Sequence, residues 1–323
     1  MAIARLKLLL LALAAGCTPG WTGTSGPEPA PARTSPPRPD PASIRVYRSA
    51  THERVSLDEL AAAATRFDVL VFGEQHDDPE THFAEFALLQ GIGGRRSGVA
   101  LSMEMFERDV QPALSSYLRG ETSETEFLAQ SRPWERYATD YRPMVQLARA
   151  RGWPVIAANV PRPIASAVSR KGLSAIDTLS ATSRAWAAKE FVCAHDGYYD
   201  RFAEEMKGHS AGGGPPTAAD VAQMAAMTDK FYEAQCVKDE TMAESIARLF
   251  LNRPESRPFA FHVTGAFHSD YRQGTVQRLV RREPNVRVLV VTAVPVDDPA
   301  SATMASLDTR ADYVIFTKKP SGK

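Results

Sequence analysis

Short apolar runs alternate with helical patterns from about residue 44 onwards. The runs are rich in Val, Ile and Phe and are followed by Gly, Asn or charged residues, which is typical of buried strands. The predicted strands are 44–48, at a sheet edge, then 69–72, 99–103, 154–158, 258–264, 287–291 and 313–317. Helices are predicted at 57–65, 79–89, 108–118, 141–151, 163–169 and 275–282. This alternation indicates an α/β fold with a mostly parallel sheet and helices on both faces.

Two segments interrupt the alternation. Residues 121–140 and 174–251, in approximate bounds, have helical patterns without intervening strands. We expect both to be insertions that form an all-α cap on the sheet, and such caps often cover a ligand cleft. The folded domain then spans residues 43–323.

The amino terminus has the pattern of an export signal. Arg5 and Lys7 precede the apolar run 8–15, which is too short for a membrane-spanning helix of about 20 residues. The sequence Leu13-Ala14-Ala15-Gly16-Cys17 resembles the lipobox of bacterial lipoproteins, in which the Cys is acylated. The alternative is an ordinary signal peptide cleaved nearby. Residues 18–42 are rich in Pro, Ser, Thr, Gly and Ala and are predicted to form a disordered tether.

Charge and cysteine content limit the classes of ligand and covalent link that the sequence supports. The 38 basic and 38 acidic side chains balance, and no basic run is interleaved with aromatic residues, so no nucleic-acid partner is expected. With Cys17 assigned to the lipobox, Cys193 and Cys236 remain. In an exported protein they favour a disulfide, and two buried free thiols are the alternative. The C-x-x-C-H motif of covalent haem attachment is absent.

A G-x-x-H unit follows two of the predicted strands, at Gly73–His76 and again at Gly265–His268. We expect Gly to supply the backbone angles of a sharp turn at each strand end. In a parallel sheet, ligands bind beyond the carboxyl ends of the strands. His76 and His268 are therefore predicted to face one cleft.

Other polar residues also occupy strand ends, namely Glu74, Glu104 and Asn159. Imidazole and carboxylate groups together suit either a divalent metal site or a general base. Candidate metal ligands are His76, Glu104 and His268, and Glu74 joins them as a candidate catalytic residue. The alternatives are structural: Glu74 and His76 in a turn or cap before the next helix, and His268 in a local hydrogen bond.

The remaining histidines rank lower. His262 lies within a predicted strand, where a hydrogen-bonded core position is expected, while His52, His82 and His209 are expected to be solvated. His195 differs because it lies in a cap segment close to Asp196, Tyr198 and Tyr199.

One face of the predicted cap helix 221–251 carries Phe231, Gln235, Asp239 and Met242 at helical spacing. Buried Gln and Asp need hydrogen-bond partners. The pair either fastens the cap to the sheet or lines the ligand pocket. We favour the first role, with Arg162 as a partner for Asp239.

Taken together, these motifs resemble the ChaN family of iron-regulated, haem-binding bacterial lipoproteins, which is related to the Tiki proteases and the erythromycin esterases. The resemblance spans about residues 67–282. The motifs are Gly73-Glu74-Gln75-His76, Glu104, Trp134 with Tyr137, Asn159-Val160-Pro161-Arg162, Gln235 with Asp239 and Met242-Ala243, and Gly265-Ala266-Phe267-His268 with Asp270-Tyr271 and Gly274.

The resemblance implies one of two functions. A ChaN-like protein would be lipid-anchored in the bacterial cell envelope, in the outer membrane, and would bind haem at a homodimer contact for iron uptake or storage. A Tyr phenolate would ligate the iron, assisted by a His. Candidate haem-binding residues are Tyr137, Tyr198, Tyr199, Tyr232 and His195. A Tiki-like or esterase-like protein would instead be a metal-dependent hydrolase that uses Glu74, His76, Glu104 and His268.

Overall fold

The computed structural model describes residues 43–207, 217–251, 258–304 and 309–320. The lipobox cysteine Cys17, the tether at 18–42 and His209 lie outside the described residues. The described residues belong to one compact unit.

An eight-stranded sheet forms the centre of this unit, with the order β2-β1-β8-β7-β3-β6-β4-β5. All neighbouring pairs from β8 to β5 are parallel, and only β1 and β2 add antiparallel pairs, which confirms the predicted fold class. The predicted edge strand β1 is second from the edge, because the short strand β2, which the sequence pattern missed, pairs outside it. The strands are β1 Arg45–Arg48, β2 Glu53–Val55, β3 Val69–Glu74, β4 Val99–Glu107, β5 Val155–Asn159, β6 Phe259–Gly265, β7 Val288–Val296 and β8 Tyr313–Lys318.

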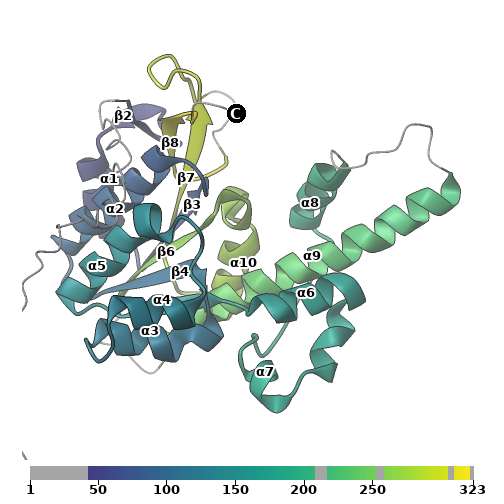
Figure 1. The fold of residues 1–323 in the computed structure, drawn as a ribbon. Helices are drawn as coiled ribbons and strands as arrows, with labels where there is room; N and C mark the ends of the chain where they lie inside the picture. The colour runs from purple at the N-terminus through teal and green to yellow at the C-terminus, as the bar shows by residue number, and fades with distance from the viewer. Residues whose placement is uncertain (1–42, 208–216, 252–257, 305–308, 321–323) are drawn as a thin grey trace, which may run out of the picture. The chain divides into compact units, whose positions relative to one another are not determined.

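Helices cover both faces of the sheet (Figure 1). They are α1 Leu57–Ala64, α2 Pro79–Gly93, α3 Gln111–Leu118, α4 Glu124–Ser131, α5 Arg142–Arg151, α6 Arg162–Lys171, α7 Ala181–Ala185, α8 Gly197–Lys207, α9 Ala218–Ala247 and α10 Gly274–Arg282. Short helical turns are η1 Arg108–Val110, η2 Tyr137–Tyr141, η3 Leu173–Thr178, η4 Ala266–His268 and η5 Asp270–Arg272.

The two faces of β3 show how the sheet divides the core. Leu70 and Phe72 pack in the cluster that contains the apolar sides of α1, α2, α3 and α5. Val69 and Val71 pack in the opposite cluster with α10 and the carboxyl-terminal part of α9. Alternate side chains of a strand point to opposite faces, so a continuous apolar run requires cover on both.

Local sequence signals fix the start of α2 beside the sheet edge. The Asp78 side chain accepts a hydrogen bond from the backbone N–H of Glu80 at 2.9 Å, and Pro79 occupies the first turn. Both features were predicted from the sequence, since Asp caps orphan N–H groups and Pro needs none there.

The cap is built around α9, which is 30 residues long. Its carboxyl-terminal part packs on the sheet, and the remainder extends away beside α6, α7 and α8 (Figure 1). Across the four described segments, none of the helices has the length and hydropathy of a membrane span.

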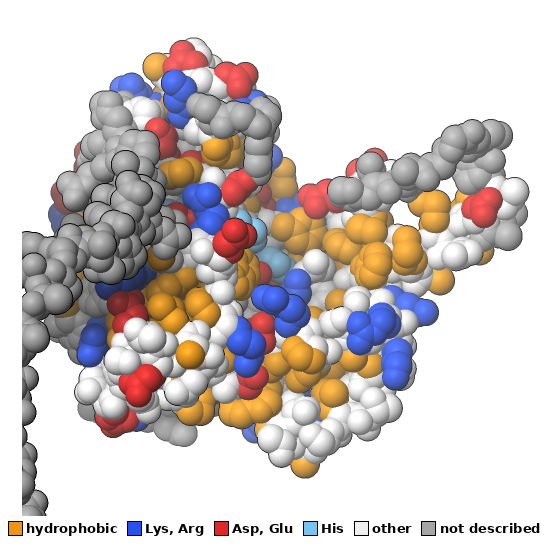
Figure 2. All heavy atoms as spheres, in the orientation of Figure 1, with side chains coloured by type: hydrophobic (Ala, Val, Ile, Leu, Met, Phe, Trp, Pro, Cys, Tyr) orange, Lys and Arg blue, Asp and Glu red, His pale blue; other side chains and the backbone are white. Residues whose placement is uncertain are grey.

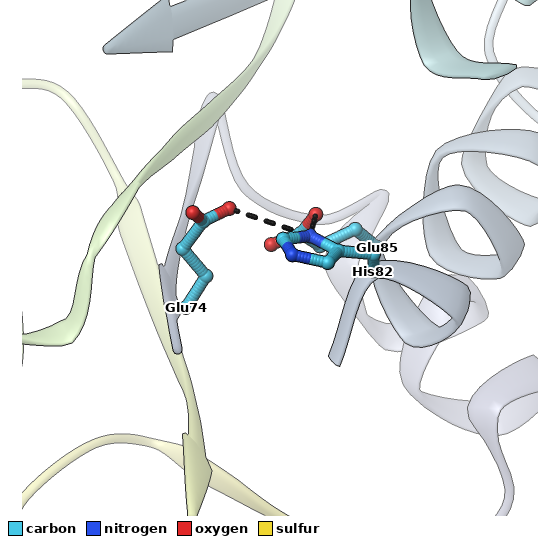
Figure 3. Close-up of side chains that lie close together, drawn as sticks. All are labelled: Glu74, His82 and Glu85. Carbon is cyan, nitrogen blue, oxygen red and sulfur yellow. Dashed lines mark hydrogen bonds and ion pairs between the residues drawn. The ribbon is translucent and has the colours of Figure 1, made fainter. Parts of the chain in front are cut away.

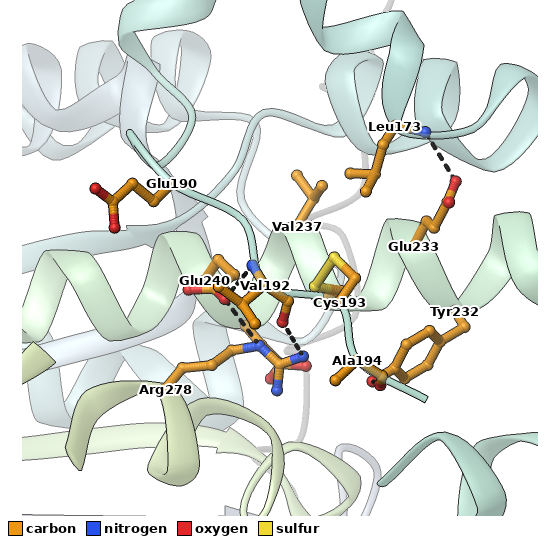
Figure 4. Close-up of a disulfide and its surroundings, with 12 residues drawn as sticks. Leu173, Glu190, Val192, Cys193, Ala194, Tyr232, Glu233, Val237, Glu240 and Arg278 are labelled. Carbon is orange, nitrogen blue, oxygen red and sulfur yellow. Dashed lines mark hydrogen bonds and ion pairs between the residues drawn. A yellow bond between two sulfur atoms is a disulfide. The ribbon is translucent and has the colours of Figure 1, made fainter. Parts of the chain in front are cut away.

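A disulfide joins Cys193, in the segment before α8, to Cys236 on α9, with an S–S distance of 2.01 Å (Figure 4). On the next turn of α9, the buried Glu240 accepts a hydrogen bond from the Val192 backbone N–H at 2.8 Å. The same carboxylate lies 3.5 Å from Arg278 of α10. Covalent and ionic links therefore fasten the cap segment to α9 and α10.

Candidate functional site

The carboxyl ends of β3, β4 and β6 lie at one edge of the sheet. In the parallel register, Glu74 pairs with Gly265, and Met103 pairs with Val263. The two G-x-x-H units begin within the last residues of β3 and β6 at this edge, so the structure brings both motifs to one place, as the sequence indicated.

The motif glycines permit close packing. Neither has a positive φ, since Gly73 lies inside β3 and Gly265 has φ −57°. A Cβ on Gly73 would lie 2.5 Å from Ser269 Oγ and 2.9 Å from the Ala266 Cα. A Cβ on Gly265 would lie 3.0 Å from the imidazole of His76. The prediction that these glycines supply unusual turn angles is therefore wrong.

Glu104 lies inside β4, because this strand continues beyond its predicted end at residue 103. Its Oε2 accepts hydrogen bonds from the Thr264 hydroxyl at 2.6 Å and from the Gly265 N–H at 2.9 Å. Its Oε1 lies 3.8 Å from His268 Nε2. Burial alone would raise the pKa of Glu104, but the neighbouring histidines, above all His268, and the Thr264 hydroxyl lower it to about 2. Glu104 is therefore an ionised acceptor at neutral pH.

His268 connects the sheet edge to the cap. Its Nδ1 lies 2.9 Å from Asp239 Oδ1 on α9. Asp239 also accepts hydrogen bonds from the hydroxyls of Tyr198 at 2.7 Å and Thr275 at 2.8 Å. The prediction that Arg162 is the partner of Asp239 is wrong. The Arg162 side chain is 75% exposed and pairs with Glu107 instead. Burial alone would lower the pKa of His268, but its two carboxylate neighbours raise it.

His76 is held at the mouth of the site. Its Nδ1 lies 2.5 Å from Glu74 Oε1, which also accepts a hydrogen bond from the Tyr141 hydroxyl at 2.7 Å. Trp134 packs edge-on against the imidazole, with ring centroids 4.9 Å apart. The side chain of His76 is 47% exposed, whereas Glu74 is fully buried. Among the described residues, Nε2 of His76 makes no hydrogen bond, so this atom is available to a ligand.

A second group of titratable side chains lies behind His76. His82 Nδ1 lies 3.1 Å from Glu85 Oε2 and 3.7 Å from Glu74 Oε2 (Figure 3). The side chain of His82 is only 4% exposed, so the expectation of a solvated histidine is wrong. Burial raises the pKa of Glu74 and the pKa of Glu85, each to about 8.

The side chains that lie close enough together to bind a metal ion differ from the ligand set expected from the sequence. In the described part of the chain, the side chains of Glu74, His82 and Glu85 place three ligand atoms within 4.8 Å of one another. Only Glu74 belongs to the paired G-x-x-H and Glu pattern. The metal-binding role of His76, Glu104 and His268 stays a prediction.

Two pockets meet at His76. One has a volume of about 520 Å³, and its lining includes Trp134, Tyr141, Arg132 and Arg162. The other has a volume of about 540 Å³. Its lining comprises Glu74, Gln75, His76, Arg201, Glu205, Gly265, Ala266, Phe267, Asp270, Tyr271 and Arg310. Figure 2 shows histidine side chains in a hollow between basic, acidic and apolar patches.

The tyrosines proposed from the sequence do not line these two pockets. Tyr137, Tyr198 and Tyr232 are buried, and the Tyr198 hydroxyl is committed to Asp239. Tyr232 donates its hydroxyl to the carbonyl of Ala194 at 2.7 Å. The structure therefore places Tyr198 and Tyr232 in the core of the cap, and Tyr137 in the core cluster beside the sheet with Phe106 and Phe127.

Tyr199 and His195 lie together at the cap surface. Their rings stack with centroids 3.8 Å apart, and the Tyr199 hydroxyl donates to Asp229 at 2.7 Å. The side chain of His195 is 57% exposed. Neither residue lines the pockets at His76.

Sequence reasoning missed Tyr271 as a site residue. It follows the second G-x-x-H unit by three positions, is 41% exposed and lines the larger pocket. Its backbone has φ 61°, in the left-handed region that a bulky residue rarely adopts. Its position directly after the motif was the available signal.

Two other expected site residues have local roles. The Asn159 side chain accepts a hydrogen bond from the Val160 N–H at 2.9 Å, which fixes the end of β5. His262 is fully buried in β6, and its Nδ1 lies 3.0 Å from the Ser102 hydroxyl. His262 is therefore the hydrogen-bonded core residue that was expected.

The fold and the paired motifs at one sheet edge define an α/β protein with a capped strand-end site. A family described as haem-binding uptake, Tiki superfamily, ChaN matches residues 60–279. The chain belongs to this family. No curated protein sequence matches the chain.

Solved structures give a consistent fold. The structure of ChaN from Campylobacter jejuni, which describes cofacial haem binding to that protein, superposes with a TM-score of 0.60 at 14% identity. The match covers 85% of this chain and 97% of that one. An erythromycin esterase mutant in its open conformation has a TM-score of 0.45 at 12% identity, covering 77% of this chain and 76% of that one. The second similarity is too low to carry an argument.

Proposed function

We propose that this protein binds haem in the pocket that contains His76 and Tyr271. The observation that carries the proposal is the combination of an exposed imidazole and an exposed phenol on one cavity of about 540 Å³. Membership of a haem-binding uptake family supports the proposal, as does the fold shared with a ChaN that binds haem.

The lining of this pocket offers groups that a bound haem would use. Haem supplies an iron that accepts an axial phenolate or imidazole ligand. The contact of Glu74 with Nδ1 of His76 orients the ring and leaves Nε2 facing the pocket. Arg201 and Arg310 lie 5.2 Å and 5.9 Å from the Tyr271 ring, and their guanidinium groups suit the propionate carboxylates.

Titration of the purified chain with hemin tests this proposal. A saturable shift of the Soret band at one site per chain is expected, and His76→Ala should weaken binding by about tenfold or more. His195→Ala is the matched control, because His195 is also exposed but lies outside both pockets. The proposal fails if the spectrum remains that of free hemin, or if both variants bind as the wild type does.

Hydrolysis is a second candidate function, favoured by one observation. Asp239 orients His268, whose Nε2 faces Glu104, and this order resembles a base held by a carboxylate. Burial opposes the idea, since His268 and Glu104 are only 7% and 4% exposed. A screen of peptide and ester substrates decides it: turnover in the wild type that is lost in His268→Ala would support hydrolysis.

We also propose a lipid anchor at Cys17 and a position in the bacterial cell envelope, in the outer membrane, with a role in iron uptake. The lipobox-like Leu13–Cys17 supports the anchor. Metabolic labelling with a palmitate analogue tests it: label absent from Cys17→Ala and present in the wild type is the expected result.

A homodimer is the proposed assembly for haem binding. The cofacial haem arrangement described for the Campylobacter jejuni protein supports it. Light scattering of the chain with and without hemin provides the test. A monomer mass at saturating hemin would contradict it.

A further inference from the structure

The group formed by Glu74, His82 and Glu85 has the composition of a metal site. Glu74 comes from the end of β3, and His82 and Glu85 lie three residues apart on α2, so they project from one face of that helix. Their side chains are 0%, 4% and 0% exposed. Figure 3 shows the Glu74 carboxylate pointing at the His82 imidazole, with Glu85 beside it.

The orientation of His82 turns its Nδ1 towards both carboxyl groups. Its Nε2 lies 3.2 Å from the His76 carbonyl oxygen and 3.4 Å from Asp140 Oδ2, and both of these atoms are acceptors. Nε2 therefore faces two atoms to which it can donate a hydrogen bond, while Nδ1 faces Glu74 and Glu85. A metal-ligating histidine is usually fixed in this way, by donating its other N–H to a carbonyl or carboxylate.

Two carboxylate oxygens in this group lack a partner. Oε2 of Glu74 and Oε1 of Glu85 are buried and make no hydrogen bond with any described residue. The other oxygen of Glu74 already accepts from Tyr141 and lies against His76. Leaving a buried carboxylate oxygen unpaired is costly, so a cation or a proton is required between these side chains.

The spacing suits a cation. Two ligands bound about 2.1 Å from one ion at a tetrahedral angle lie roughly 3.4 Å apart. The distances from His82 Nδ1 to Glu85 Oε2 and Glu74 Oε2, 3.1 Å and 3.7 Å, bracket this value. One imidazole nitrogen with two carboxylate oxygens is a ligand set that Zn²⁺, Mn²⁺ and Fe²⁺ accept.

We propose that Glu74, His82 and Glu85 bind one divalent transition-metal ion, with Zn²⁺ as the first choice. The ion is separate from the haem iron, and the proposal stands independently of haem binding. It also has a structural consequence for His76. Glu74 would bind the ion through Oε2 and hold the His76 ring through Oε1, while His82 would bind it through Nδ1 and hold the His76 carbonyl through Nε2. The ion therefore fixes both the side chain and the backbone of His76.

Metal analysis of the haem-free chain, prepared without chelator and then reconstituted with ZnCl₂, tests the proposal. One Zn²⁺ per chain is expected, with a rise in the midpoint of thermal unfolding that EDTA reverses. Glu85→Gln should weaken the affinity for Zn²⁺ by at least about tenfold. Glu107→Gln is the matched control, because it makes the same substitution at a carboxylate on β4 that is only 12% exposed and lies outside this group, so it should retain the ion.

The wild type alone gives a second readout. Co²⁺ bound by this ligand set should produce visible absorption bands that Zn²⁺ abolishes by competition. The proposal is overturned if the wild type binds no ion and its unfolding is unaffected by Zn²⁺, Mn²⁺ or Co²⁺, because protons then satisfy the two carboxyl groups. It is also overturned if Glu85→Gln retains the ion while Glu104→Gln loses it, because the ion then lies among His76, Glu104 and His268.

Discussion

Nδ1 of His268 lies 2.9 Å from Oδ1 of Asp239 on α9. This contact joins the last histidine of the paired motif, on the sheet edge, to the central helix of the cap. Both side chains are buried, so the bond forms in an environment of low dielectric, where charged partners interact strongly. The cap and the site therefore depend on each other for stability.

Asp239→Asn should reduce the free energy of unfolding by about 3 kcal/mol, because it leaves the buried His268 without its carboxylate partner. Denaturant unfolding at neutral pH provides the measurement. Asp229→Asn is the control. The Asp229 side chain is 42% exposed, so this substitution should lower the free energy of unfolding by less than about 1 kcal/mol. Equal losses in the two variants would show that the Asp239 contact does not stabilise the cap.

Acid stability should depend on Glu104. Its pKa of about 2 in the folded state lies below the ordinary value of 4.5, so the carboxylate stabilises the fold fully above pH 4.5. This contribution is lost as the pH falls from 4.5 towards 2. Glu104→Gln removes this pH-dependent contribution. Between pH 4.5 and 2, the free energy of unfolding of the variant should therefore fall by about 3 kcal/mol less than that of the wild type. Denaturant unfolding at a series of pH values measures the difference, and parallel curves would contradict the prediction.

Gly73→Ala should destabilise the fold by about 1–3 kcal/mol, because the added methyl group would overlap the backbone of Ala266 at 2.9 Å. Gly98→Ala is the control. Its Cβ would meet Pro258 at 3.9 Å, an ordinary contact, and the variant should unfold much as the wild type does. Thermal unfolding distinguishes the two, and a wild-type midpoint for Gly73→Ala would refute the close-packing role.

Reduction of the disulfide should destabilise the cap. Cys193 and Cys236 are 43 residues apart, and closing a loop of this length restricts the unfolded chain by up to about 4 kcal/mol. Unfolding of the wild type with and without reductant measures the loss. A Cys193→Ala/Cys236→Ala variant controls for reductant effects and should match the reduced wild type. Equal stability in the oxidised and reduced states would contradict the prediction.

Much of the fold could be predicted from periodicity. Continuous apolar runs such as 69–72 identified parallel strands with two buried faces, and Asp78-Pro79 identified the start of a helix. The short strand β2 could not be found in this way, because the sequence Glu53-Arg54-Val55 has no apolar run. It forms only through pairing with β1.

The location of the site could also be predicted from the sequence, since the G-x-x-H units at two strand ends meet at one sheet edge. The residues that contact these motifs could not be predicted. Asp239 reaches His268 from a helix 29 positions away in the sequence, so its true partners depend on packing. His82 was expected to be solvated because a helical histidine carries no signal of burial, yet the fold places it between Glu74 and Glu85. Tyr271 directly follows the second G-x-x-H unit, but its exposure in the pocket depends on the fold and could not be predicted from the sequence.

The absorption spectrum of hemin bound to Tyr271→Phe, compared with Tyr199→Phe, tests the central claim most directly. Phe retains the ring of Tyr271, so only the phenol oxygen is lost. The account predicts that Tyr271→Phe alters the Soret band and weakens hemin binding, while Tyr199→Phe leaves both unchanged because the Tyr199 hydroxyl is bonded to Asp229. A wild-type spectrum and affinity in Tyr271→Phe would contradict haem binding in the pocket formed by His76 and Tyr271.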